Sequence, residues 1–495
     1  MKFIIHPFII ILVIFSTTTS AQSYSAKVVD KITGEAIPFA TIQTGENRGL
    51  ITNEEGNFTL LENLIQEIQD SIYISSMGYE NKGVSISDSL EEVIELNPKP
   101  FEIKEVFLSN RLLTPKEIID EVKENLEANY ANELSHKKIF FRQSDINEMR
   151  KVDLGFIKST IEELNKELID SIANLIPKKS DSYLELAGDL YGNYKSSKLY
   201  IDKAANLYDK SKDLSSKGLT DRLEKIFKEN VKPDSYLKIK SGIIGTKVDL
   251  DDLDGENDEK TTKNITIDTI QQSIHQQTKD RISELYEQLF FHEDSELDFL
   301  EKSNRYNFEL EDYTFIDDAS VYKISFLPKG RKDFKGLMYV DTQSYAIVRL
   351  EFENVRPLQS FGMFGISYSR SVFKGKMLFG KDLNGKYSPR YLELEDGNNF
   401  GLKRPLKIIE KNKHVKGRRK QNELSLALDI KGRSTKKYEL VVFSSEVILN
   451  GDFNNAAENE AVKATYLSRY DPTFWQDYTI MEPNAAIRSF EVVTE

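Results

Sequence analysis

The sequence has 495 residues, of which 67 are basic and 80 are acidic, and its net charge is −13. This acidic balance argues against a nucleic-acid partner, which would require a basic stripe, and it disfavours simple adsorption to an anionic membrane face. The absence of cysteine excludes disulfides, cysteine metal sites and a lipid-anchored cysteine, whereas 39% hydrophobic residues allow the about two to four domains that the length predicts.

Residues 1–21 have the layout of a secretory signal peptide. Lys2 precedes an unbroken apolar run from Phe8 to Phe15, which is too short to span a bilayer, and small polar residues follow. The small-residue rule places cleavage between Ala21 and Gln22. Loss of Lys2 would leave a net charge of −14. We therefore expect an exported protein, in the periplasm or associated with the outer membrane, with a retained N-terminal anchor as the alternative.

Residues 22–99 carry the pattern of a small antiparallel β-sandwich. Apolar residues such as Ile37 and Phe39 alternate with their neighbours, and Gly, Asn and Asp turns interrupt the alternation every few residues. The glycines do not open a helix followed by Lys-Ser/Thr, so a phosphate loop is excluded. The turn at 53–56 lacks the alternating acidic ligands of a calcium loop. These glycines are therefore interpreted as turn residues that permit positive φ.

Three stretches of this region, "GEAIPFATI", "GLITNEEGNFTL" and "DSIYISSMGYENKGVSI", resemble the carboxypeptidase-regulatory-like domain. The resemblance covers about residues 23–99 and implies a seven-stranded transthyretin-like β-sandwich without peptidase chemistry. Such domains commonly precede envelope receptors and secreted proteins of Bacteroidetes-type bacteria. The segment "FEIKEVFL" at 101–108 loosely matches the continuation seen in those receptors.

Residues 100–311 are predicted to be mainly helical. Thr114, Pro115 and Glu117 form a capping box before an apolar helical face. A strand is expected at 136–145, and the stretch 157–232 shows mostly helical spacing. Residues 249–264 are strongly acidic, but their spacing does not fit a calcium loop, so we interpret them as a solvated loop between helical segments.

Residues 312–450 are predicted to form an antiparallel β-meander or half-barrel, on which a tail at 451–495 packs. Val348, Leu350 and Phe352 alternate with charged residues and define a candidate ligand or docking face. Other leucines of the meander are expected to join this face: Leu392, Leu394, Leu424, Leu426 and Leu428. Either helices cover the face completely, or part of it remains open as a groove for acyl chains.

The segment 322–353 resembles a step of periplasmic lipoprotein-carrier-like half-barrels and of a Bacteroidetes-type envelope family of unknown function. That family also joins a regulatory-like sandwich to an Ile-Ile helix and a Phe-Phe-Arg strand, which corresponds here to Phe140, Phe141 and Arg142. Its larger members continue into an outer-membrane barrel. This chain stops soon after residues 470–484, so the resemblance carries no barrel function over.

No enzymatic motif stands out in the sequence. Only four histidines follow the signal region, none of them in a metal-binding spacing, and no GxSxG elbow is present. His292, followed by Glu293 and Asp294, is better explained as a polar helix end than as a metal site. We therefore expect a multidomain α+β envelope protein, non-enzymatic and without cofactor, metal or nucleic acid. It would bind a protein partner or lipid-like ligand, with peripheral membrane association allowed; the alternative is a hydrolase of envelope polysaccharide or peptide.

Overall fold

The computed structural model describes residues 23–45, 48–68, 70–85, 91–99, 113–232, 234–242, 244–249, 273–316, 319–382, 384–414 and 420–492. The predicted cleavage site at Ala21 and Gln22, and residues 250–264 of the acidic stretch, lie outside these ranges.

The N-terminal part is a sandwich of two small sheets, with strand orders β4–β1–β7 and β3–β2–β5–β6. The elements are β1 (Tyr24–Asp30), β2 (Thr41–Gly45), β3 (Arg48–Ile51), β4 (Asn57–Leu60), α1 (Glu62–Glu67), β5 (Ser71–Ser75), β6 (Lys82–Ser85) and β7 (Val93–Leu96). Strand β7 runs parallel to β1, whereas the sequence predicts a wholly antiparallel sandwich.

The turn between β3 and β4 shows why the sequence needs a glycine there. The side-chain oxygen of Asn53 accepts hydrogen bonds from the backbone N–H groups of Glu55 and Asn57, both at 2.9 Å. Gly56 then has φ of 78°, and a Cβ at this position would lie 2.6 Å from the carbonyl oxygen of Val28. Glycine is therefore required both by the backbone conformation and by the close approach of β1.

A large sheet forms the rest of the protein, with strand order β13–β14–β15–β16–β18–β19–β20–β8–β9–β10–β21. β17 pairs with β18, and the β11–β12 hairpin pairs with the far end of β19. Every pair is antiparallel except β10 with β21 (Thr465–Leu467). The strands of the predicted meander are β13 (Tyr306–Ile316), β14 (Ala319–Pro328), β15 (Phe334–Asp341), β16 (Ile347–Asn354), β17 (Gln359–Met363), β18 (Ile366–Lys381), β19 (Tyr387–Asn412) and β20 (Lys420–Val447).

The expectation of a mainly helical middle region is wrong, because five strands of the large sheet come from it. They are β8 (Ser135–Ser159), β9 (Lys179–Gly192), β10 (Ser197–Leu207), β11 (Ser235–Ser241) and β12 (Ile244–Asp249). In β9, Tyr183, Leu186 and Ala187 are all buried although they point to both faces. A strand that is buried on both faces loses the two-residue alternation by which strands are recognised.

The helices are short apart from α5 and α6. They are α2 (Pro115–Glu124), α3 (Leu126–Asn129), α4 (Lys166–Leu175), α5 (Ser211–Asn230), α6 (Ile274–Glu287), α7 (Asn450–Asn455) and α8 (Ala485–Arg488). The predicted capping box of α2 is present, since the Thr114 hydroxyl accepts from the Glu117 N–H and the Glu117 carboxylate accepts from the Thr114 N–H. Within the described residues, none of the helices has both the length and the apolar character needed to cross a membrane.

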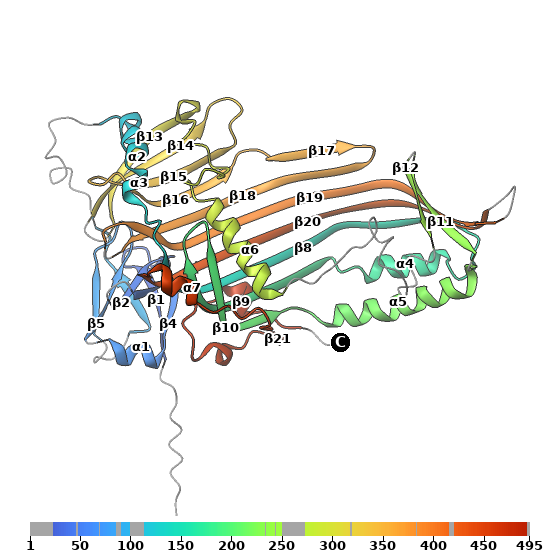
Figure 1. The fold of residues 1–495 in the computed structure, drawn as a ribbon, viewed down its shortest axis with the longest axis horizontal. Coiled ribbons are helices and arrows are strands. Elements are labelled where there is room, and N and C mark those ends of the chain that lie inside the picture. The colour runs from blue at the N-terminus through green and yellow to red at the C-terminus, as the bar shows by residue number, and fades with distance from the viewer. Residues whose placement is uncertain are drawn as a thin grey trace, which may run out of the picture.

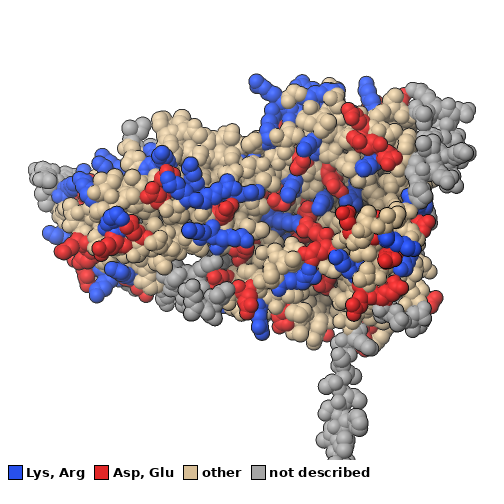
Figure 2. Space-filling model, turned by 180° about the vertical axis from the view of Figure 1, so that it is seen from behind, with Lys and Arg blue, Asp and Glu red and all other residues tan. Residues whose placement is uncertain are grey.

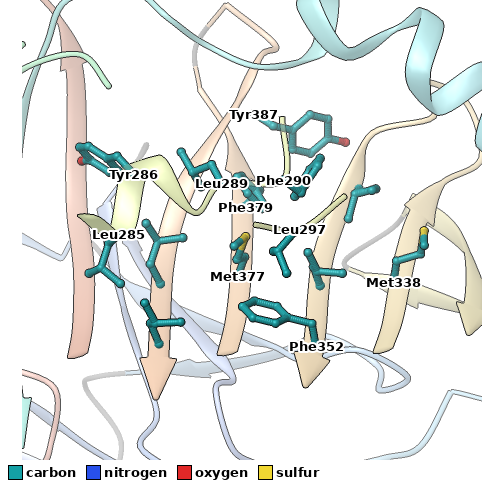
Figure 3. Close-up of a cluster of buried hydrophobic side chains, with 14 of the residues drawn as sticks. Leu285, Tyr286, Leu289, Phe290, Leu297, Met338, Phe352, Met377, Phe379 and Tyr387 are labelled. Atoms are coloured by element: carbon teal, nitrogen blue, oxygen red, sulfur yellow. The ribbon is translucent and has the colours of Figure 1, made fainter. Parts of the chain in front are cut away.

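The central part of the large sheet is buried on both faces (Figure 1). One face carries α2, α6 and the segment after α6, and Figure 3 shows Leu285, Leu289 and Phe290 of this cover lying over the strands. The other face packs against the sandwich and against the C-terminal tail, which contributes Trp475 and Met481 to that core. β18, β19, β20 and β8 continue well beyond the sandwich, towards the β11–β12 hairpin at the far end (Figure 1).

Candidate functional site

The structure places the three residues of the predicted face in the core under α6. Val348, Leu350 and Phe352 are 7%, 0% and 4% exposed, and Phe352 is drawn in Figure 3 among the side chains that α6 covers. Val348 is an extra residue in a β-bulge opposite Tyr339 and Val340. Leu392 and Leu394 lie in the same core. This part of the face is therefore a closed core, which is the first of the two alternatives that the sequence leaves open.

The remaining leucines of the predicted face lie on the long extension of the sheet. Residues paired directly across antiparallel strands point to the same face. The register therefore brings Leu402, Ile430 and Val152 into one row across β19, β20 and β8. We call ten apolar residues on this face of the extension the apolar shelf: Val152, Leu154, Phe156, Phe400, Leu402, Leu406, Leu424, Leu426, Leu428 and Ile430. Arg404, which is 7% exposed and donates to the Ser241 carbonyl, lies on the same face between Leu402 and Leu406.

The apolar shelf is only partly covered. Leu426 is 7% exposed and Phe400 is 39% exposed, while the other members are half-buried. None of the ten belongs to the cores described above or to the small core between α4 and α5. Phe400 lies across Gly432, where a Cβ would approach its ring to 2.4 Å, so the glycine makes room for the aromatic side chain.

The opposite face of the same four strands is polar. Lys403, Asp429 and Asp153 form one row across it, and the neighbouring row contains Lys431 and Lys151. The Nζ of Lys151 lies 2.5 Å from a carboxylate oxygen of Asp429, and this hydrogen bond is the main reason why the pKa of Asp429 is lowered. Figure 2 shows lysine and arginine side chains along the extended part of the molecule. The extension is thus an amphipathic sheet.

A charged pocket of about 360 Å³ lies where the apolar shelf meets α6. Arg370 forms ion pairs with Glu296 and Asp396 at 2.8 and 2.7 Å. Burial opposes the charge of this guanidinium, but hydrogen bonds to the two carboxylates outweigh burial and raise its pKa. Lys436 also lines the pocket and forms no ion pair with any described residue. Other polar lining residues are Arg281, Glu284, Glu287, Gln288, Tyr368, Asn398 and Tyr438.

A buried ion cluster, which sequence reasoning missed, joins the large sheet to the sandwich and the tail. Arg142 is 1% exposed, donates to Glu185 at 2.7 Å and donates to the Met481 carbonyl at 2.8 Å. The Trp475 indole N–H also donates to Glu185, at 3.1 Å. The full cluster consists of Arg142, Glu185, Tyr391, Glu393, Lys437 and Glu439.

The Phe-Phe-Arg stretch explains how β8 reaches both cores. Phe140 packs against Trp475 in the core shared with the sandwich, whereas Phe141 packs against Tyr438 in the core under α6. Arg142 returns to the side of Phe140 and enters the buried ion cluster. The sequence signal for the cluster was present as this motif, but its partners are 43 or more residues away in the chain.

Carboxylates gather in a surface hollow of about 420 Å³ beside the sandwich. They form ion pairs with basic residues, as in Lys335–Glu353 at 2.8 Å, Lys374–Glu395 at 3.0 Å and Arg349–Glu351 at 2.5 Å. Glu393 lies 3.0 Å from Lys437; burial favours its neutral form, but the charges of Lys437 and Lys376 outweigh burial and lower its pKa. This carboxyl group therefore stays ionised and is unsuited to act as a general acid.

The histidines occupy separate positions. His136 contacts Asp189 at 2.6 Å and stacks on Tyr191, while the Nε2 of buried His275 lies 2.8 Å from the Leu199 carbonyl. His292 lies in the turn after α6, where its Nδ1 accepts from the Asp294 N–H at 3.3 Å. Within the described part of the chain, no group of three or more His, Asp or Glu side chains is arranged to hold a metal ion.

Comparisons with known proteins identify the N-terminal part only. Structures that share 7–10% identity with this chain include a lipoprotein-sorting protein domain from Vibrio parahaemolyticus (TM-score 0.20, 69% of this chain and 97% of that chain) and a LolA superfamily protein from Nitrosomonas europaea (0.16, 69% and 98%). A third is MucB in complex with MucA (0.15, 67% and 99%). No curated protein matches the sequence. Residues 24–108 match the family model of the CarboxypepD_reg-like domain, so the chain carries such a domain at its N-terminus.

Proposed function

We propose that this protein is a non-enzymatic, exported component of the cell envelope that binds an acyl-chain amphiphile on the apolar shelf. One observation carries the proposal: a half-buried, mainly apolar face, which holds Arg404 as its charged residue, crosses β19, β20 and β8 and ends at a charged pocket. An acyl chain lying on the shelf would remove its own apolar surface and that of the shelf from water. This burial would stabilise the complex by roughly 25 cal/mol per Å² of apolar area.

The charged pocket suits the polar head of such a ligand. Tyr368 lies on the shelf side of the pocket and is paired with Phe400, so the apolar and polar surfaces are continuous. Lys436 offers an ammonium group beside its cross-strand neighbours Asp396 and Asp145, and Asn398 offers both a donor and an acceptor. A molecule with an acyl chain and an anionic or zwitterionic head would fit this arrangement, with its chain on the apolar shelf and its head group in the charged pocket.

The hydrolase alternative has weaker support. Glu393 and Glu439 come together in the buried ion cluster, but both accept from the Tyr391 hydroxyl and both face Lys437. The charges of Lys437 and Lys376 outweigh burial and lower the pKa of Glu393, whereas a glycosidase needs one carboxyl group with a raised pKa. The cluster is better explained as a structural junction between the sandwich, the sheet and the tail.

The test is a titration of the mature protein with a fluorescent dansyl fatty acid. We expect saturable binding by the wild type and a loss of about tenfold in affinity for Leu428→Gln, because the substitution places an amide on the shelf. Ala427→Gln is the matched control, since Ala427 is exposed and points to the opposite face of the same strand. Absence of saturable binding by a folded wild type, or equal loss in both variants, would refute the proposal.

A further inference from the structure

The β17–β18 hairpin ends in a tip that is unusually apolar for an exposed position. Residues 358–369, "LQSFGMFGISYS", contain no charged residue, in a chain that is 30% charged. Phe361, Met363, Phe364 and Ile366 are 49%, 52%, 62% and 39% exposed. The register pairs Met363 with Ile366, so these side chains lie together at the tip. Four large exposed apolar side chains on one short hairpin form a patch of the kind that marks an interaction site.

The backbone of the tip adds a second observation. Phe364 and Gly365 both have positive φ, at 53° and 77°, and they form the two-residue loop between paired Met363 and Ile366. Such a loop favours Asn-Gly, because asparagine tolerates the left-handed region much better than a bulky residue does. Phenylalanine at this position is therefore unfavourable for the turn and is left largely in water. Neither the geometry of the turn nor burial within the chain accounts for a phenylalanine at this position.

A polar hairpin elsewhere in the same sheet shows what an ordinary turn looks like. Between β18 and β19 the side chain of Asp382 accepts from the N–H groups of Asn384 and Lys386, and Gly385 takes the positive φ. That turn carries polar residues and its own hydrogen bonds. The apolar tip of β17–β18 thus departs from the turn chemistry used by the neighbouring connection.

The charges around the tip indicate what it contacts. The N–H of Lys403 donates to the carbonyl of Gly365 at 2.6 Å, so β19 brings this lysine beside the tip. Lys403, Lys431 and Lys151 lie on the polar face with two carboxylates, Asp429 and Asp153. Although the whole chain is acidic, this neighbourhood carries a local excess of positive charge. Apolar side chains at a tip with lysines behind it complement a bilayer, whose interior is apolar and whose head groups can be anionic.

We propose that the β17–β18 tip inserts into the interface of a lipid bilayer and so attaches the protein peripherally to a membrane. Phe361, Met363 and Phe364 enter the boundary between head groups and acyl chains, and the lysines on the polar face remain at the head groups. The register pairs Ile366 with Leu402 and Tyr368 with Phe400, so the tip adjoins the apolar shelf. The attachment nevertheless rests on the exposed side chains of the tip and requires no ligand on the shelf.

The experiment is sedimentation of the full mature chain with vesicles of phosphatidylcholine, alone or with a quarter of phosphatidylglycerol. We expect the wild type to bind, more tightly to the anionic vesicles. Phe364→Asn should lower the partition coefficient by about tenfold or more, the size expected for losing one buried large apolar side chain. Because Asn-Gly is the favoured loop, the same variant should be at least as stable to heat as the wild type, which separates lost docking from lost folding.

Two further variants complete the test. Leu327→Asn changes an apolar side chain that is 45% exposed on β14, away from the tip, and should bind vesicles like the wild type. Phe364→Trp should show a blue shift of its emission when vesicles are added. A folded wild type that binds neither vesicle, or a Phe364→Asn variant that binds as tightly, overturns the proposal and assigns the tip to a protein partner instead. Dansyl fatty-acid binding by Phe364→Asn should be unchanged, so failure of this proposal and failure of the shelf proposal give different results.

Discussion

Replacing Arg142 with methionine should destabilise the junction between the large sheet, the sandwich and the tail by about 3–5 kcal/mol, the range for breaking a buried ion pair on one side. Arg142 is 1% exposed and is bonded to Glu185, and a guanidinium nitrogen lies 3.9 Å from Glu439. Methionine is similar in length, so little packing is lost. The cost comes from Glu185, which would keep only the Trp475 N–H as a partner in the interior.

A second substitution, at Glu185, measures how much of this cost comes from the Arg142–Glu185 interaction itself. Glu185→Gln removes the charge but keeps the shape and can still accept from Trp475, whose N–H lies 3.1 Å away. In the double variant with Arg142→Met neither buried charge remains without its partner. We therefore expect the double variant to be less destabilised than the sum of the two single variants, with a coupling free energy of about 0.5–3 kcal/mol.

The assay is urea denaturation followed by tryptophan fluorescence, because Trp475 is the only tryptophan of the chain and contacts Glu185. Arg150→Met is the matched control in the same strand, since Arg150 and Glu148 form a pair whose side chains are about half exposed. That variant should hardly shift the midpoint. The reasoning fails if Arg142→Met costs no more than Arg150→Met, or if the effects of Arg142→Met and Glu185→Gln simply add.

The remaining predictions concern pH, a turn and the core. The pKa of Glu393 is lowered in the folded state, so the ionised carboxylate stabilises the fold at pH values above its unfolded pKa of about 4.3. This stabilisation is lost as the pH falls below that value. The difference in urea midpoint between the wild type and Glu393→Gln should therefore become smaller on acidification. Gly56→Val should lower stability by about 1–3 kcal/mol, while Gly45→Ala, where a Cβ meets nothing within 4 Å, should not; equal effects on melting temperature would contradict the turn argument. Leu350→Ala should cost about 2–5 kcal/mol in denaturant unfolding because Leu350 is fully buried, and a smaller loss would show that the face is open.

Local signals in the sequence predict the elements that depend on few residues. The capping box at Thr114 and the Gly56 turn are correct because each is decided within four residues. β9 and β10 lie within the stretch 157–232, for which the sequence predicts helix. The strands escape recognition because their side chains are buried on both sides, in the core under α6 and in the core shared with the sandwich. That double burial depends on segments hundreds of residues away, and no window along the sequence contains it.

In the candidate site, too, some features depend on nearby residues and others on distant segments of the chain. Alternation predicts that Leu350 and Leu428 belong to one apolar face, and the register places both on the same side of the sheet. Which part is covered depends on where α6 lies, and its hydrophobic side chains reach Leu350 but not Leu428. The tip at Phe364 was missed because a prediction based on apolar alternation treats an exposed apolar hairpin as another piece of core.

β19 also fixes the distance between the N-terminal sandwich and the β17–β18 tip. It is paired with β20 without interruption from Tyr391, which stacks on Phe39 of the sandwich, to Leu402, next to the β17–β18 tip. At about 3.3 Å per residue those eleven steps span roughly 36 Å. The strand thus acts as a rigid spacer between the sandwich and the tip. Two contacts made at its ends would be held at a constant separation, and the first would raise the effective concentration of the second.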